Sequence, residues 1–158
     1  MKNMSTFFLK LVILLIAIAT LTALIAFPRA EGRATNLNLV SIYTDPFIMY
    51  VYFASIPFFV ALWQAVKLLG YIEKNKVFSP IAVKVLRNIK YCALAIIGLL
   101  SGAMFYIRVV AQVDDSAGII MLGLMAFFAS LVIATATAVF QQLLQNAVNI
   151  KSENDLTV

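Results

Sequence analysis

Four long runs of apolar residues, separated by short polar segments, define the pattern of this chain. The runs cover approximately residues 7–27, 47–70, 91–110 and 118–140. As helices rising about 1.5 Å per residue, runs of about 20 residues cross a hydrocarbon core roughly 30 Å thick. The runs lack the alternation of barrel strands, and hydrocarbon offers no partner to backbone N–H and C=O groups. The sequence therefore predicts an all-α fold, a four-transmembrane-helix bundle.

The polar segments divide this single membrane domain, residues 1–158, into inner and outer parts. We expect an outer loop at 28–46, a cytoplasmic loop at 71–90 and a cytoplasmic tail at 141–158. A short outer turn, 111–117, makes the last two helices an antiparallel hairpin.

The last two helices are expected to extend beyond the membrane into the cytoplasm. Ser79-Pro80 places a capping side chain before a proline at the first helical position, which predicts that the third helix begins at Pro80. Its extension has an apolar side formed by Ile81, Val85 and Ile89. Apolar residues also recur at helical spacing after residue 140, so the sequence predicts a pair of cytoplasmic helix ends.

Acidic or hydroxyl residues precede two of the helices. Asp45-Pro46 is the expected start of the second helix, and Asp114, Asp115 and Ser116 are the expected cap of the fourth.

Composition supports a membrane protein, because 63% of the 158 residues are hydrophobic and only 12% are charged. The net charge of +5 could indicate a nucleic-acid partner, but the positions of the charges favour a topology signal. Arg29, Arg33 and Arg108 are the basic residues on the outer side. The other nine lie on the inner side: Lys2, Lys10, Lys67, Lys74, Lys76, Lys84, Arg87, Lys90 and Lys151. We expect a multi-pass protein of the plasma membrane with both termini in the cytoplasm and no direct contact with nucleic acid.

Small residues on the last two helices are typical of close helix packing in membranes. Gly98 and Gly102 form one G-x-x-x-G motif. A second stripe on the fourth helix consists of Ala126, Ser130, Ala134 and Ala138. Packing inside one chain is the favoured interpretation, and a homo-oligomer interface is the alternative.

Residues that would carry catalysis or bind a metal are scarce. The chain has no histidine and one cysteine, Cys92, and it lacks phosphate-binding and hydrolase motifs, so we expect no enzyme activity, cofactor or metal. The spans hold no charged residue near their centres. An alternative function is a small-solute transporter, a pore subunit or a lipid-binding membrane module. A transporter or pore would need a cavity lined by Ser, Thr and Gln between the helices.

Three segments carry a family resemblance. They are the carboxyl-terminal stretch from Ile150 to Val158, Phe78-Ser79-Pro80 and Leu86-Arg87-Asn88-Ile89-Lys90. With the Phe53 to Phe58 region and Asp114-Asp115, these segments resemble the YoaS-like family of bacterial four-helix integral membrane proteins, a domain of unknown function. The resemblance extends from about residue 45 to the end of the chain.

The resemblance implies no established activity, but genes of this family are frequently paired with those of small helix-turn-helix regulators. By analogy, it implies a membrane protein that holds or releases a cytoplasmic regulator. We expect a regulatory or interaction protein that contacts a soluble partner through its inner loop and tail, although the tail could also be a solvated helix end. The residues expected to dock the partner are Asn75, Phe78, Ser79, Arg87, Lys90, Glu153, Asn154 and Asp155.

Overall fold

The computed structural model describes residues 2–30, 46–110 and 117–156, excluding the side chains of residues 2, 3, 27, 29, 30, 110, 155 and 156. Its helices are α1 (Lys2–Ala30), α3 (Pro46–Glu73), α4 (Pro80–Phe105), the short π-helix η2 (Tyr106–Val110) and α5 (Ala117–Leu156). The caps expected from Asp45 and from Asp114, Asp115 and Ser116 lie outside the described residues.

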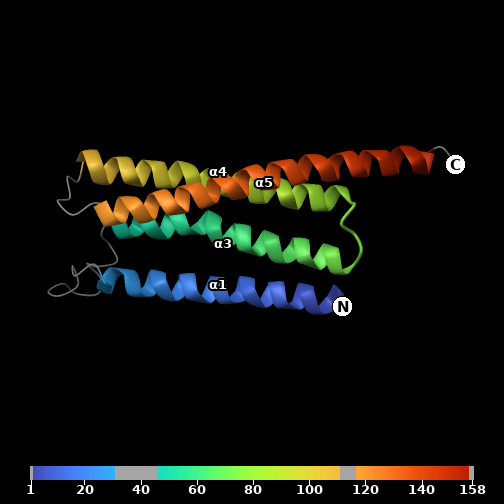
Figure 1. The fold of residues 1–158 in the computed structure, drawn as a ribbon. Helices are drawn as coiled ribbons and strands as arrows, with labels where there is room; N and C mark the ends of the chain where they lie inside the picture. Colours follow the sequence, from blue (N-terminus) through green and yellow to red (C-terminus); the bar gives the residue numbers. More distant parts are fainter. Residues whose placement is uncertain (1, 31–45, 111–116, 157–158) are drawn as a thin grey trace.

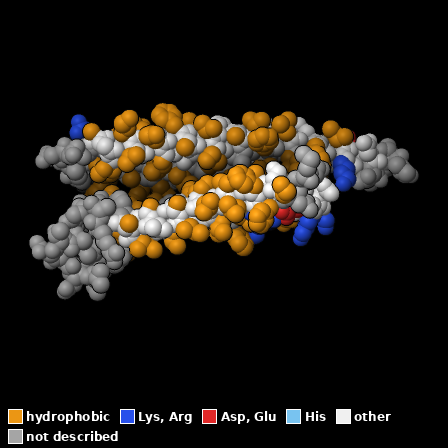
Figure 2. Space-filling model, turned by 60° about the horizontal axis from the view of Figure 1, so that its bottom comes forward, with side chains coloured by type: hydrophobic (Ala, Val, Ile, Leu, Met, Phe, Trp, Pro, Cys, Tyr) orange, Lys and Arg blue, Asp and Glu red, His pale blue; other side chains and the backbone are white. Residues whose placement is uncertain are grey.

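The four long helices run side by side as an elongated bundle (Figure 1). Helix α4 packs against both α3 and α5, whereas α1 packs against α3. Both termini lie at the same end of the bundle, together with the turn that joins α3 to α4 (Figure 1). We call this the basic end, because most of the described Lys and Arg side chains gather there (Figure 2).

Four helices are long and apolar enough to cross a membrane. The spans are Met4–Ala26, Pro46–Glu73, Pro80–Val109 and Ala117–Asn154. Large apolar side chains cover the outside of the bundle, as Figure 2 shows, and Leu122 remains 70% exposed. Lipid tails solvate such a surface without cost, whereas water does not. For the described residues this confirms an all-α fold with four helices long and apolar enough to span a membrane, while the orientation of the bundle stays a prediction.

Helices α1 and α5 are both longer than their apolar runs. Helix α1 continues through Pro28 to Ala30, although we expected it to stop at Phe27-Pro28. Helix α5 has 40 residues and, at about 1.5 Å per residue, is about 60 Å long, twice the thickness of a hydrocarbon core. Its final part projects past the other helices at the basic end (Figure 1).

Most of the buried apolar residues in the described part of the chain lie toward the basic end, although Ile48, near the opposite end, is 1% exposed. Ala82, Val83 and Leu86 of α4 pack with Leu144 of α5 in one buried cluster. Val85 and Ile89 are also buried, whereas Ile81, the third residue of the predicted apolar side, is 56% exposed. The face of α4 turned toward α5 includes Ala82. This cluster binds the α4 and α5 ends to each other.

Along the α4–α5 hairpin, small and hydroxyl side chains allow close approach. Ser130, Ala134 and Thr137 are buried on one face of α5. The hydroxyls of Ser130 and Thr137 donate to carbonyls of their own helix, at Ala126 and Ile133. These hydroxyls are therefore satisfied locally rather than arranged along a polar path.

Candidate functional site

A tight turn at the basic end connects α3 to α4. Asn75 has a φ of 52°, in the left-handed region that Asn tolerates better than most residues. Its N–H donates to the Ile72 carbonyl at 3.2 Å, and the Lys76 N–H donates to the Tyr71 carbonyl at 2.9 Å. These two bonds form a Schellman motif, which satisfies carbonyls at the end of α3. Asn75 thus has a structural role in closing the helix.

Ser79 fixes the other side of the turn. Its Oγ accepts a hydrogen bond from the Ala82 N–H at 3.4 Å and donates one to the Lys76 carbonyl at 2.7 Å. Pro80 then occupies the first position of α4, so the predicted cap is confirmed. Because both helix ends are capped, the residues between them are held in a defined conformation.

A cleft lies between this turn and the projecting part of α5. Its volume is about 600 Å³. We call it the docking cleft, because three of the residues expected to dock a partner line it. Its described lining consists of Asn75, Lys76, Phe78, Ser79, Ala147, Ile150 and Lys151. The two lysines are the charged residues in this lining, which has no acidic side chain. The cleft therefore combines an apolar floor with positive charge from both α5 and the turn.

Phe78 is the most prominent apolar side chain of the turn. It is 59% exposed although it lies in the loop between two spans. It also borders an apolar groove of about 380 Å³, formed with residues such as Leu68, Phe140 and Leu143. On its α1 side, a third cleft of about 520 Å³ includes Ser5, Thr6 and Glu73. Phe78 therefore borders the docking cleft, the apolar groove and the third cleft, and it is accessible from several directions.

Three of the predicted docking residues, Asn75, Phe78 and Ser79, come together in the docking cleft. The described lining does not include Arg87, which is exposed on α4, or Lys90, whose Nζ donates to Oε1 of Gln141 at 2.9 Å. Lys90 thereby links α4 to α5.

The predicted residues of the tail lie in the last turns of α5. Glu153 and Asn154 are exposed there and do not line the docking cleft. The Asp155 side chain lies outside the described part of the structure.

Sequence reasoning missed four residues of the docking cleft as docking residues: Lys76, Ala147, Ile150 and Lys151. Ala147, Ile150 and Lys151 could have been identified from the sequence, because the apolar period of α5 continues past residue 140 and ends at a lysine. Lys76 could have been selected because it lies in the turn between the helix-capping residues Asn75 and Ser79, where its side chain is not packed between helices.

Helix α1 reaches the basic end through an ion pair. Lys10 Nζ lies 2.6 Å from Glu73 Oε2, and each side chain is about one third exposed, at 33% and 31%. Ser5 and Thr6 lie near the same place, in the cleft beside Phe78. Helix α1 therefore flanks the turn.

The described residues do not form a metal site of the usual kind. Within ranges 2–30, 46–110 and 117–156, no group of three His, Cys, Asp or Glu side chains is placed to hold a metal ion. The docking cleft contains neither a cysteine nor a carboxylate in its described lining.

Comparison with known proteins gives a family. The family described as "Protein of unknown function (DUF2975)" matches residues 28–158. The chain belongs to this family. It is also 47% identical over 161 residues to "Uncharacterized membrane protein YoaS" of Bacillus subtilis (strain 168), an alignment that covers 100% of both chains. No solved structure matches the chain.

Membership of the DUF2975 family confirms the resemblance found in the sequence and is consistent with a membrane protein. The family match begins at residue 28, so it includes the whole of α3, α4 and α5 but little of α1. The docking cleft lies entirely within the matched part, since its lining comes from the α3–α4 turn and α5.

Proposed function

We propose that this DUF2975 protein is a non-enzymatic protein of the plasma membrane that docks a cytoplasmic protein at its basic end. Both termini, the α3–α4 turn and the end of α5 then lie in the cytoplasm. The observation that carries the proposal is the docking cleft, where Phe78 lies beside Lys76 and Lys151.

The orientation is supported by charge. Lys and Arg side chains gather at the basic end (Figure 2), and positive residues near membrane spans favour the cytoplasmic side. Arg108, in η2, is the basic residue with a described side chain at the opposite end. This orientation places the docking cleft where a soluble cytoplasmic protein can reach it.

The chemistry of the cleft specifies the partner surface. An aromatic side chain with an exposed fraction of 59% offers apolar area, and interface cores are enriched in such anchors. Two lysines at its border favour an acidic surface on the partner, chiefly by steering the encounter. The partner is therefore a protein with an apolar segment flanked by Asp or Glu. The family resemblance suggests a small helix-turn-helix regulator.

The fold supports a regulatory use of this surface. Helix α5 runs along the whole bundle and lines the cleft near its end, so displacement of its far half would be transmitted to Ile150 and Lys151 along one rigid element. Partner binding would in turn favour the α5 position that forms the cleft.

Affinity capture from native membranes tests the docking cleft, with quantitative mass spectrometry of the recovered proteins. The reversal Lys76→Glu with Lys151→Glu, and separately Phe78→Ala, should reduce the recovery of one soluble protein by about tenfold, as expected for about 1.4 kcal/mol. Lys84→Glu is the charge control, since Lys84 is exposed on α4 outside the cleft lining. Phe128→Ala is the aromatic control, at a residue 58% exposed within a span. Equal recovery from all variants would refute the proposal.

A further inference from the structure

A pocket lies between α3 and α4 at the end of the bundle opposite the basic end. We call it the far-end pocket; its volume is about 340 Å³ and its described lining is Pro46, Phe47, Tyr50, Gly102, Ala103 and Tyr106. This volume is at the lower limit of ordinary ligand sites, and no charged side chain is part of that lining. The site is suited to a small uncharged group rather than to an ion.

The pocket exists because α4 presents small residues to the aromatic residues of α3. Gly102 and Ala103 form the α4 wall, and a Cβ atom at Gly102 would lie 3.3 Å from the Tyr50 hydroxyl. That hydroxyl donates to the Leu99 carbonyl at 2.6 Å, which anchors the Tyr50 ring across the helix pair. The space is therefore maintained by a fixed ring and by the absence of side chains opposite it.

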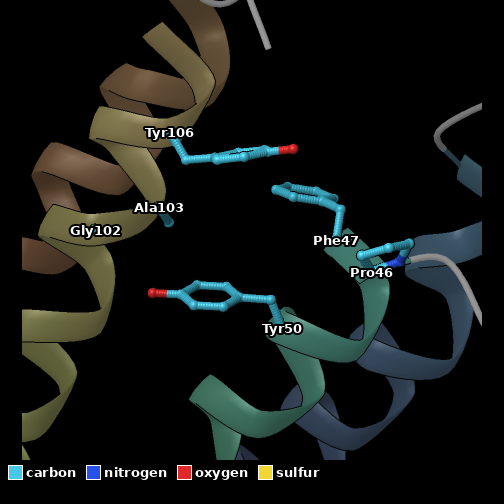
Figure 3. A pocket seen from close by; sticks show the side chains of 6 residues that line it. All are labelled: Pro46, Phe47, Tyr50, Gly102, Ala103 and Tyr106. Atoms are coloured by element: carbon cyan, nitrogen blue, oxygen red, sulfur yellow. The ribbon is translucent and has the colours of Figure 1, made fainter. Parts of the chain in front are cut away.

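The backbone also changes at this pocket. Helix α4 passes into the π-helix η2 at Tyr106, one of the lining residues. π-Helical turns are rare and frequently mark functional sites. Here the change of helix type sets the direction of the Tyr106 side chain, which Figure 3 shows extending over the open space.

The shape of the open space specifies a planar occupant. In Figure 3 the rings of Tyr106, Phe47 and Tyr50 are all seen nearly edge-on, with Tyr50 on one side of the space and the other two on the opposite side. A flat ring placed between them would stack on aromatic faces. A flexible lipid chain would gain no comparable stacking.

A hydrogen-bond donor, the Tyr106 hydroxyl, lies at the border of the pocket beside Phe47, as Figure 3 shows. Among the described residues the Tyr106 hydroxyl has no hydrogen-bond partner, and the residue is 50% exposed. An oxygen acceptor on the ring could accept from this hydroxyl. The pocket lies between two helices that are long and apolar enough to span a membrane, so an apolar molecule can enter it from the lipid.

We infer that the far-end pocket binds a planar, uncharged ring that carries a carbonyl oxygen and is soluble in the membrane. Menadione, a naphthoquinone ring without a long chain, is a suitable probe, and 2-methylnaphthalene is the matched ring without carbonyl groups. This site is independent of the docking cleft, from which it is separated by the length of the spans.

Equilibrium dialysis against the full-length protein in phosphatidylcholine nanodiscs, with empty nanodiscs subtracted, tests the inference. Saturable menadione binding is expected, and Gly102→Val should weaken it at least about fivefold by filling the space. Gly98→Val is the matched control, because a Cβ atom at Gly98 meets nothing within 4 Å. Its menadione binding should equal that of the unmodified chain.

Tyr106→Phe keeps the ring and the fold while removing the donor. It should weaken menadione binding about two- to tenfold, as for loss of one hydrogen bond, and leave 2-methylnaphthalene binding unchanged. Non-saturable partition, equal binding by Gly102→Val and the unmodified chain, or equal loss of both rings in Tyr106→Phe would overturn the assignment. Displacement of menadione by hexadecanol at equal concentration would also overturn it, because the site would then accept a lipid chain.

Discussion

Lys10 of α1 and Glu73 of α3 form an ion pair, with Nζ 2.6 Å from Oε2, although 63 residues separate them in the chain. The pair joins the first helix to the end of α3, directly before the turn that contains Phe78. The most apolar stretch of the α1 span has no buried residue, so α1 is held chiefly by its contacts with α3. The ion pair is therefore one of the contacts that fix α1 beside the basic end.

Exchange of the two charges tests this attachment. Because both side chains are about one third exposed, the coupling energy should be small, about 0.2–1 kcal/mol. Lys10→Glu and Glu73→Lys should each lower stability, and the double exchange should restore most of it. Denaturant unfolding in mixed micelles measures the four chains of this double-mutant cycle. If the double exchange loses as much free energy of unfolding as the two single changes added together, the pair contributes nothing to stability.

Loss of the Ser79 cap should loosen the start of α4. Ser79→Ala removes the acceptor of the Ala82 N–H and is expected to cost about 1 kcal/mol, whereas Ser79→Asp should retain most of the stability. Hydrogen exchange at the amides of residues 81–83 reports the local effect. Ser152→Ala, which removes a bond to the Asn149 carbonyl near the end of α5, is the control and should leave exchange at 81–83 unchanged.

Close packing of α4 against α5 can be tested at Gly123. A Cβ atom there would lie 3.1 Å from Sδ of Met104, so Gly123→Val should destabilise the hairpin by about 1–3 kcal/mol. Gly118→Val introduces the same side chain on the same helix where nothing lies within 4 Å. Thermal unfolding in detergent should show a lower midpoint for the first variant than for the second, and equal midpoints would contradict the packing described.

The proposed orientation predicts which residues a membrane-impermeant maleimide can label. In a Cys92→Ser background, Arg108→Cys should be labelled in intact cells, and Lys151→Cys only after the membrane is opened. Both sites carry exposed side chains, so exposure does not distinguish them. Labelling of Lys151→Cys in intact cells would place the basic end outside and refute the proposed docking of a cytoplasmic protein.

The features predicted correctly from the sequence are those that depend on local pattern. The four spans follow from the length of apolar runs, because a helix is the backbone structure that satisfies its own hydrogen bonds in lipid. The cap formed by Ser79 before Pro80 follows from the preferences of two adjacent residues. The helical continuation of α5 follows from its apolar period.

The features that were missed depend on how distant helices align. Ile81, on the predicted apolar side of α4, remains exposed, whereas its neighbour Ala82 is buried in the cluster with Leu144 of α5. Lys151 joins Lys76 in one cleft only because the antiparallel helices bring the end of α5 alongside the α3–α4 turn. The register between helices is set by side-chain packing, which periodicity within one helix does not encode.

Site-specific photocrosslinking at Phe78 tests the docking cleft most directly. Benzoylphenylalanine placed at Phe78 in living cells should form a crosslink to one soluble cytoplasmic protein, and the combined changes Lys76→Glu and Lys151→Glu should abolish that crosslink. The same group at Phe128, which is equally exposed within a span, should react with lipid alone. If the group at Phe78 also reacts with lipid alone, the docking proposal is contradicted.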